Sequence, residues 1–301
     1  MTYLSKAISI NILMLLFAVA GATITIKEVA AQELQTYELD ECHLENDMIT
    51  PDGAEIYYRV CGEGPPLLLV HGFFATGELW EPFLDDLASS YTVIVPDMRG
   101  HGRSSNPDDT FIHKKSGGDM LAVLDDLGIE EVQAVGFSSG AMSLLHAATL
   151  QQDMFKSLVL LGGTTHFPET SRAIQRNAGF EAFPPEVSTL LRRWHPGNDE
   201  QIRELFANFR DMAANYRDMN FTEPLMGTIS AETLIVHGDR DEHFPMEIAV
   251  RMYRAIPDAY LWIVPNGNHG LLFEVWGGSF PGSGAFIHVL QEFLSGEWPQ
   301  Q

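Results

Sequence analysis

Short apolar runs alternate with longer amphipathic stretches along most of this chain. The runs are rich in Val, Leu or Ile and are bounded by Gly, Pro or Asp, which is typical of strands buried on both faces. Six such runs follow one another: 66–71, 92–96, 132–137, 157–161, 233–237 and 260–264. Most of the intervening stretches suit one crossover helix each, so the pattern predicts an α/β fold with a mostly parallel sheet and helices on both faces.

A hairpin is expected before the first of these runs. The turn signal Pro51-Asp52-Gly53 separates residues 45–50 from a strand-like run at 55–60. With the turn centred near residue 52, antiparallel register places position 61 opposite position 42 or 43. The hairpin would extend the sheet to eight strands. It would also bring together Cys42 and Cys61, the two cysteines of the chain.

A disulfide between these cysteines is therefore geometrically feasible. Closing a loop of about 20 residues would contribute roughly 3 kcal/mol of stability. Two unlinked thiols are the alternative. Nothing in the sequence resembles a metal-binding Cys pattern.

The interval between residues 161 and 233 is too long for a single crossover helix. It contains helical stretches that begin near residues 185 and 199. We expect a helical cap at 164–228, inserted between core segments 32–163 and 229–301 and lying over the carboxyl ends of the strands. We expect most of its aromatic residues to form the core of the cap: Phe167, Phe180, Phe183, Trp194, Phe206, Phe209, Tyr216 and Phe221.

The N-terminal segment has the pattern of an export signal. Lys6 precedes an apolar stretch at 7–26, and small residues end at Ala31. We expect a signal peptide over 1–31 and a periplasmic or secreted protein, an environment that favours a disulfide. Cleavage after Ala20 and an uncleaved anchoring helix are the alternatives, because about 20 apolar residues can span a bilayer.

Composition restricts the partners of the chain. The 301 residues are 45% hydrophobic, enough for a large core, and the formal net charge is −23. Long-range repulsion makes nucleic acids and anionic membrane surfaces poor partners. No phosphate-binding Gly-rich loop follows the first strand, so the sequence predicts no cofactor and no metal.

Ser138 is the predicted nucleophile. It lies in Gly136-Phe137-Ser138-Ser139-Gly140, directly between a predicted strand and a helix expected over 141–150. This turn is so tight that the residues two before and two after the serine must be small, and it holds the hydroxyl at the end of the sheet.

A serine hydroxyl needs a general base, and the base needs a carboxylate. His269 follows the last predicted strand, and Asp241 follows the strand at 233–237, with Asp239 as the alternative carboxylate. The carboxyl ends of parallel strands share one edge of a sheet, so these groups should meet Ser138 there. Among the other histidines, His71 and His101 are expected to bond backbone groups, His146 falls inside the helix after the nucleophile, and no site context is evident for His113 or His195.

Two backbone N–H groups are candidates for the oxyanion hole. The N–H of Ser139 begins the helix after the nucleophile, and Phe73 follows His71-Gly72 at the end of a strand. Gly72 lets the main chain turn inward at that point.

Five motifs together resemble the α/β-hydrolase family. In chain order they are PPLLLVHGF, PDMRGHGRS, GFSSG, LIVHGDRDEHFP and NGNHG. The chain is most similar to the cap-bearing branch of esterases, carbon-carbon hydrolases and cofactor-free perhydrolases. The resemblance implies a triad of Ser138, Asp241 and His269, with oxyanion donors Phe73 and Ser139.

The second motif, PDMRGHGRS, resembles a family sequence in which Asp97, Arg99 and His101 are structural rather than catalytic. Ser138 itself argues against haloalkane dehalogenases and epoxide hydrolases, which carry Asp at this position.

The sequence therefore predicts a serine hydrolase that cleaves a carboxylic ester or lactone of a small, partly apolar substrate through an acyl-enzyme on Ser138. Carbon-carbon bond hydrolysis and perhydrolysis on the same triad are the alternatives. A non-catalytic ligand-binding protein of the same fold is a third possibility.

Overall fold

The computed structural model describes residues 42–108, 110–182, 185–273, 278, 283–296 and 298. The predicted signal peptide lies outside the described residues, as do Phe183 and most of the Gly-rich stretch at 277–284. Within the described ranges no helix is both long enough and apolar enough to cross a membrane.

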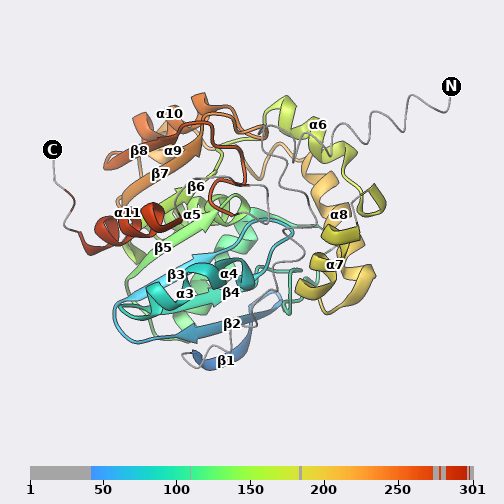
Figure 1. Ribbon diagram of the computed structural model, residues 1–301, viewed down its shortest axis with the longest axis horizontal. Coiled ribbons are helices and arrows are strands. Elements are labelled where there is room, and N and C mark those ends of the chain that lie inside the picture. Colours follow the sequence, from blue (N-terminus) through green and yellow to red (C-terminus); the bar gives the residue numbers. More distant parts are fainter. Residues whose placement is uncertain are drawn as a thin grey trace.

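Eight strands form one sheet in the order β1-β2-β4-β3-β5-β6-β7-β8 (Figure 1). β1 pairs with β2 and β2 with β4 in antiparallel register, and all the other pairs are parallel. The predicted α/β fold and mixed sheet are confirmed, and each of the six apolar runs is a strand with small shifts at its ends. The strands are β1 Cys42–Ile49, β2 Glu55–Cys61, β3 Pro66–Val70, β4 Thr92–Pro96, β5 Val132–Phe137, β6 Phe155–Leu161, β7 Glu232–Gly238 and β8 Ala259–Val264.

Helices cover both faces of the sheet because alternate residues of each buried strand point to opposite faces. Leu68 and Ala134 belong to one core cluster, which includes apolar residues of α4, α5 and α10. Leu69 and Val135 belong to the other, which includes residues of α3 and α11. The elements are η1 Gly77–Trp80, α3 Glu81–Ala88, α4 His113–Asp126, α5 Ser139–Leu150, η2 Gln152–Met154, α10 Met246–Ala255 and α11 Ser283–Ser295.

The first hairpin has the expected centre and one irregularity. Pairs such as Leu44 with Val60 and Asn46 with Tyr58 place the middle of the turn at residue 52. That register alone would set Cys61 opposite His43. A register shift between Cys42 and Leu44 brings Cys42 opposite Cys61 instead, and the two form a disulfide.

The segment between β6 and β7 is mainly helical, and Figure 1 shows α6, α7 and α8 grouped at one side of the sheet. Phe180, Leu191, Ile202 and Phe206 form a small core of their own. The cap boundaries at 164 and 228 stay a prediction. The elements are α6 Glu169–Asn177, η3 Phe180–Ala182, α7 Pro185–Trp194, α8 Asn198–Met212 and α9 Glu223–Met226.

The aromatic residues of this segment are shared between several environments. Phe167 and Phe221 belong to the core cluster that includes residues of α4, α5 and α10, not to the small helical core. Tyr216 is exposed. Of the described rings, only Phe180 and Phe206 belong to the small helical core, so the expectation that most of them form the cap core is wrong.

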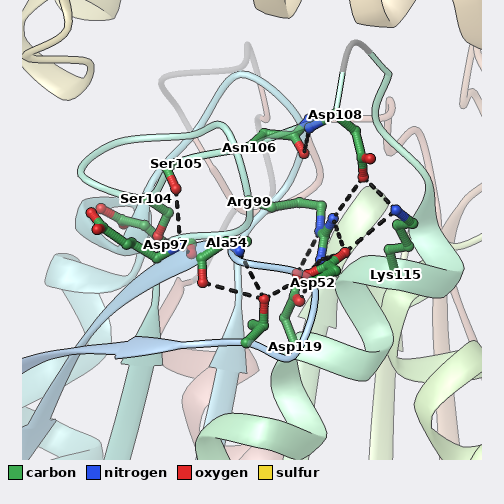
Figure 2. Close-up of polar contacts among 12 residues, drawn as sticks. Asp52, Ala54, Asp97, Arg99, Ser104, Ser105, Asn106, Asp108, Lys115 and Asp119 are labelled. Carbon is green, nitrogen blue, oxygen red and sulfur yellow. Dashed lines mark hydrogen bonds and ion pairs between the residues drawn. The ribbon is translucent and has the colours of Figure 1, made fainter.

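Arg99 connects three parts of the fold that are distant in sequence (Figure 2). Its guanidinium, which is 1% exposed, donates to both carboxylate oxygens of Asp119 in α4, at 2.7 and 2.6 Å. It also donates to Asp52 in the hairpin turn and to Asp108, each at 3.2 Å. Lys115 contacts Asp52 and Asp108 from the solvent side. The carboxylates compensate the burial of the cation, and the hairpin turn is thereby attached to α4.

Replacing Arg99 by Met should lower the free energy of unfolding by about 3–5 kcal/mol, because it leaves the buried carboxylate of Asp119 without its cation. Urea denaturation followed by circular dichroism measures the loss. The matched control is Arg192→Met, which breaks a half-exposed pair with Asp199 and should cost less than about 1 kcal/mol. Equal losses in the two variants would contradict the role assigned to Arg99.

Candidate active site

Ser138 occupies a sharp turn between β5 and α5. Its backbone φ is 50° and its ψ is −113°, a conformation that non-glycine residues rarely adopt. Although Ser138 is at the N-cap position of α5, its side chain does not cap the helix. The hydroxyl is therefore available to a partner outside the helix.

The two glycines of the motif are required by close backbone contacts. A Cβ at Gly140 would lie 2.2 Å from the carbonyl oxygen of Val70 in β3. A Cβ at Gly136 would lie 2.6 Å from the amide nitrogen of Ala141. Real Cβ atoms essentially never approach backbone this closely, so both positions exclude a side chain, as the sequence predicted.

The three predicted triad residues lie together. His269 Nε2 is 3.0 Å from Ser138 Oγ, and His269 Nδ1 is 2.8 Å from Asp241 Oδ2. Ser138 follows β5, Asp241 follows β7 and His269 follows β8, so one edge of the sheet brings all three side chains together. Asp239, the alternative carboxylate, is exposed. The geometry is that of a Ser-His-Asp triad, and the catalytic roles stay a prediction.

The side chain of Asp241 is fully buried and held by backbone donors. Its Oδ1 accepts hydrogen bonds from the N–H groups of His243 and Phe244, each at 2.8 Å. Its other oxygen faces the ring of His269. The carboxylate is thus fixed in the orientation that keeps hydrogen on Nδ1 of His269 and leaves Nε2 toward Ser138.

The charges of this pair are strongly coupled. Burial opposes ionisation of Asp241, but the facing His269 ring and its hydrogen bond outweigh burial and lower the pKa of Asp241 to about 2. Burial also favours the neutral form of His269, yet the charge and hydrogen bond of Asp241 raise the pKa of His269 above its usual value. His269 is therefore a stronger base than an isolated histidine.

Phe73 follows β3, and Ser139 begins α5 directly after Ser138. Phe73 follows Gly72, where a Cβ would lie 2.7 Å from the ring of Phe137. Ser139 is the first residue of α5, where N–H groups have no partner within the helix. Both predicted oxyanion donors are thus close to Ser138: Ser139 is its neighbour in sequence, and a Cβ at Gly72, just before Phe73, would lie 3.5 Å from Ser138 Cβ. Their role in binding an oxyanion stays a prediction.

A series of aromatic ring contacts connects Phe73 with His269. The centroid distances along the series are 5.2 Å from Phe73 to Phe111, 5.0 Å from Phe111 to His113 and 5.8 Å from His113 to Phe167. They continue at 6.4 Å from Phe167 to Phe244 and 5.1 Å from Phe244 to His269. The series thus runs from the predicted oxyanion loop to the predicted base, and most of its members are apolar.

Two histidines that have no predicted role in the site belong to this region. His113 lies 3.1 Å from Ser139 Oγ through Nε2. His195, which follows α7, bonds the N–H of Gly102 and the carbonyl of Phe74 next to Phe73. The lack of a site context for them was therefore wrong. Their neighbours are far away in sequence, so no local motif could have identified them.

The other histidine expectations agree with the structure. His71 bonds the backbone of Gly72 and Met98, and His101 bonds the backbone of Arg99. Asp97 accepts hydrogen bonds from the N–H groups of Gly77 and Arg103, which supports a structural role for this residue.

Comparison with known proteins identifies the fold. Residues 65–187 match the family model described as the alpha/beta hydrolase fold. A 2-hydroxy-6-oxo-6-(2'-aminophenyl)hexa-2,4-dienoic acid hydrolase from Metapseudomonas resinovorans is 22% identical over 80% of this chain and 90% of its own length.

Two further similar proteins are named for other activities. An epoxide hydrolase from Caballeronia sordidicola is 36% identical over a shorter region, 36% of this chain and 34% of its own length. The crystal structure of an esterase from Rhodococcus has a TM-score of 0.64 at 22% identity and covers 83% of this chain and 98% of its own. The fold is common to proteins of different chemistry, so the site itself has to decide the reaction.

The pKa values of the triad predict a pH dependence. The value of kcat/KM for an ester should fall as pH drops through the pKa of His269, because a protonated ring cannot accept the serine proton. The midpoint should lie above the value of about 6.5 that is usual for histidine.

Asp241→Asn should move that midpoint to lower pH and reduce kcat by about ten-thousand-fold. Asp239→Asn, at the exposed neighbouring carboxylate, is the matched control and should change neither quantity. Initial rates between pH 5 and 9 measure both effects. An unmoved midpoint in Asp241→Asn would contradict the assigned partnership.

Proposed function

We propose that this chain, a member of the α/β-hydrolase family, is a serine hydrolase that cleaves a carboxylic ester or lactone. The observation that carries the proposal is the contact of Ser138 Oγ with His269 Nε2 at 3.0 Å, with Asp241 at 2.8 Å behind the ring. The nucleophile, base and carboxylate are thus in hydrogen-bonding order, which is what acyl transfer from a serine requires.

The reaction would proceed in two steps. His269 Nε2 accepts the hydroxyl proton while Ser138 Oγ attacks the carbonyl carbon, and the N–H groups of Phe73 and Ser139 bind the oxyanion that forms. His269 then donates the proton to the leaving alcohol, and an acyl-enzyme is left on Ser138. Water, activated by the same ring, adds to the acyl carbon and releases the acid.

The surroundings favour a small, partly apolar substrate. Phe73, Phe111, Phe167 and Phe244 are buried, they belong to the series of ring contacts that ends at His269, and their rings present no charge. The formal net charge of −23 repels polyanions at long range. A neutral ester with an apolar portion therefore fits this site better than a highly charged compound.

Carbon-carbon bond hydrolysis is the second candidate. The dienoic acid hydrolase of Metapseudomonas resinovorans is similar over most of both chains, and the same Ser138, His269 and Asp241 could serve that reaction. Parallel assays of esters, lactones and diketones against one preparation separate the two functions.

The disulfide is relevant to the cellular compartment in which the protein resides. A Cys42–Cys61 bond is stable in an oxidising environment, so we also propose that the protein is exported to the periplasm or secreted.

Ser138→Ala should abolish turnover of p-nitrophenyl butanoate, because the acyl-enzyme can no longer form. A fluorophosphonate probe should label the wild-type protein and fail to label this variant. Ser90→Ala, which changes an exposed serine, is the control and should keep both activity and labelling. Undiminished turnover by Ser138→Ala would overturn the proposed function.

A further inference from the structure

A second Ser-His-Asp series lies beside the first. Ser139 Oγ is 3.1 Å from His113 Nε2, and His113 Nδ1 is 2.6 Å from Asp218 Oδ2. The three side chains are buried, with His113 0% exposed. They come from three separate parts of the chain: α5, the start of α4, and the stretch between α8 and α9. The proposed mechanism uses only the backbone N–H of Ser139.

Asp218 is held as an anion by several donors. Its carboxylate accepts hydrogen bonds from the backbone N–H groups of His113 and Lys114, at 2.9 and 3.2 Å. These groups begin α4, whose N-cap residue Ile112 provides no side-chain cap. Burial opposes ionisation, but His113 and these donors outweigh burial and lower the pKa of Asp218. The need to cap the N-terminus of α4 explains why a carboxylate lies at position 218. It does not explain why His113 contacts Ser139.

The contact with Asp218 determines which nitrogen of the His113 ring carries a hydrogen. A carboxylate accepts hydrogen bonds only, so Nδ1 of His113 must carry a hydrogen and Nε2 faces the hydroxyl of Ser139. If the ring is neutral, Ser139 donates to Nε2 and its oxygen can accept from a ligand. If the ring is protonated, Ser139 accepts from Nε2 and can donate. A ligand hydroxyl, which both donates and accepts, can pair with Ser139 in either state.

The side chains of Ser139, His113 and Asp218 also adjoin the predicted triad. Ser139 is bonded to the nucleophile residue, and the ring of His113 is located between those of Phe111 and Phe167 in the aromatic series described above. Ser138 is 9% exposed and Ser139 is 3% exposed, so the two neighbouring serines are buried to a similar extent. Ser139 and His113 therefore place hydrogen-bonding groups beside phenylalanine rings close to the predicted nucleophile.

We propose that Ser139, positioned by His113 and Asp218, binds a hydroxyl group that the substrate carries near the scissile carbonyl. The substrate class is then an ester of a hydroxy acid rather than of a simple fatty acid. Ser139 contacts the substrate, whereas His113 and Asp218 act through Ser139. This inference rests on the proposed ester hydrolysis by Ser138.

The test compares phenyl butanoate with phenyl 2-hydroxybutanoate and phenyl 3-hydroxybutanoate. The measured quantity is the ratio of kcat/KM for each hydroxylated ester to kcat/KM for the unsubstituted one. Ser139→Ala should lower this ratio by about tenfold for at least one hydroxylated ester, because one hydrogen bond is lost. The fraction of folded enzyme cancels within each ratio, and the intrinsic reactivities of the esters cancel when the ratio of the variant is compared with that of the wild type.

Asp218→Asn should lower the same ratio, since an amide can donate to Nδ1 and so changes the orientation of hydrogen in the series. Asp211→Asn, an exposed carboxylate at the end of α8, is the matched control and should leave the ratio unchanged. Because the readout is a ratio, a loss of stability in Asp218→Asn does not mimic the expected result.

Equal ratios in the wild type and Ser139→Ala, for both hydroxylated esters, would overturn the inference and leave the proposed function intact. The proposed function is judged separately, by Ser138-dependent hydrolysis of phenyl butanoate. If the wild type hydrolyses none of the three esters, the proposed function and this inference are both overturned.

Discussion

The strained turn at Ser138 is the constraint on which the rest of the site depends. A non-glycine residue with φ of 50° and ψ of −113° costs on the order of 1–3 kcal/mol, so the surroundings must hold it in place. They do so through the hydrogen bond from Ser138 N–H to the carbonyl of Leu161 in β6, at 2.8 Å, and through the contact of Gly140 with β3. Three neighbouring strands thus fix one residue.

That turn has two chemical consequences. It directs the hydroxyl away from the start of α5, so the oxygen reaches His269 instead of capping the helix. It also begins α5 directly at Ser139, whose N–H is then free of helical partners. The nucleophile and one proposed oxyanion donor are therefore products of the same backbone geometry.

The parts of the site that follow strands could be predicted from the sequence, because parallel strands end at a common edge. Ser138, Asp241 and His269 each follow such a strand, and periodicity located all three strands. The sequence favours Asp241 over Asp239 only slightly. The two residues belong to the same loop and have a similar sequence context. They differ in burial, which the sequence does not reveal. The residue opposite Cys61 depended on a bulge next to Cys42, which the turn signal alone cannot specify.

The parts contributed by the segment between β6 and β7 could not be predicted in this way. α6 buries Ser171, Arg172 and Gln175 rather than an apolar stripe, so the helical period of hydrophobic residues is absent. Arg172 can be buried because its guanidinium donates hydrogen bonds to backbone carbonyls such as that of Ala213, which replace its bonds to water. His113 and Asp218 are 105 positions apart, and nothing local in the sequence marks their contact.

This segment contacts the surroundings of both proposed oxyanion donors. On the Phe73 side, His195 accepts a hydrogen bond from Gly102 N–H through Nδ1, so Nε2 carries the hydrogen and donates to the carbonyl of Phe74. Burial lowers the pKa of His195 to about 4, which keeps this bridge neutral near pH 7. On the Ser139 side, Asp218 contacts His113, which in turn contacts Ser139. This connection carries the negative charge of the Asp218 carboxylate. The segment between β6 and β7 therefore contacts the residues beside both proposed oxyanion donors, so a change in its packing should alter catalysis.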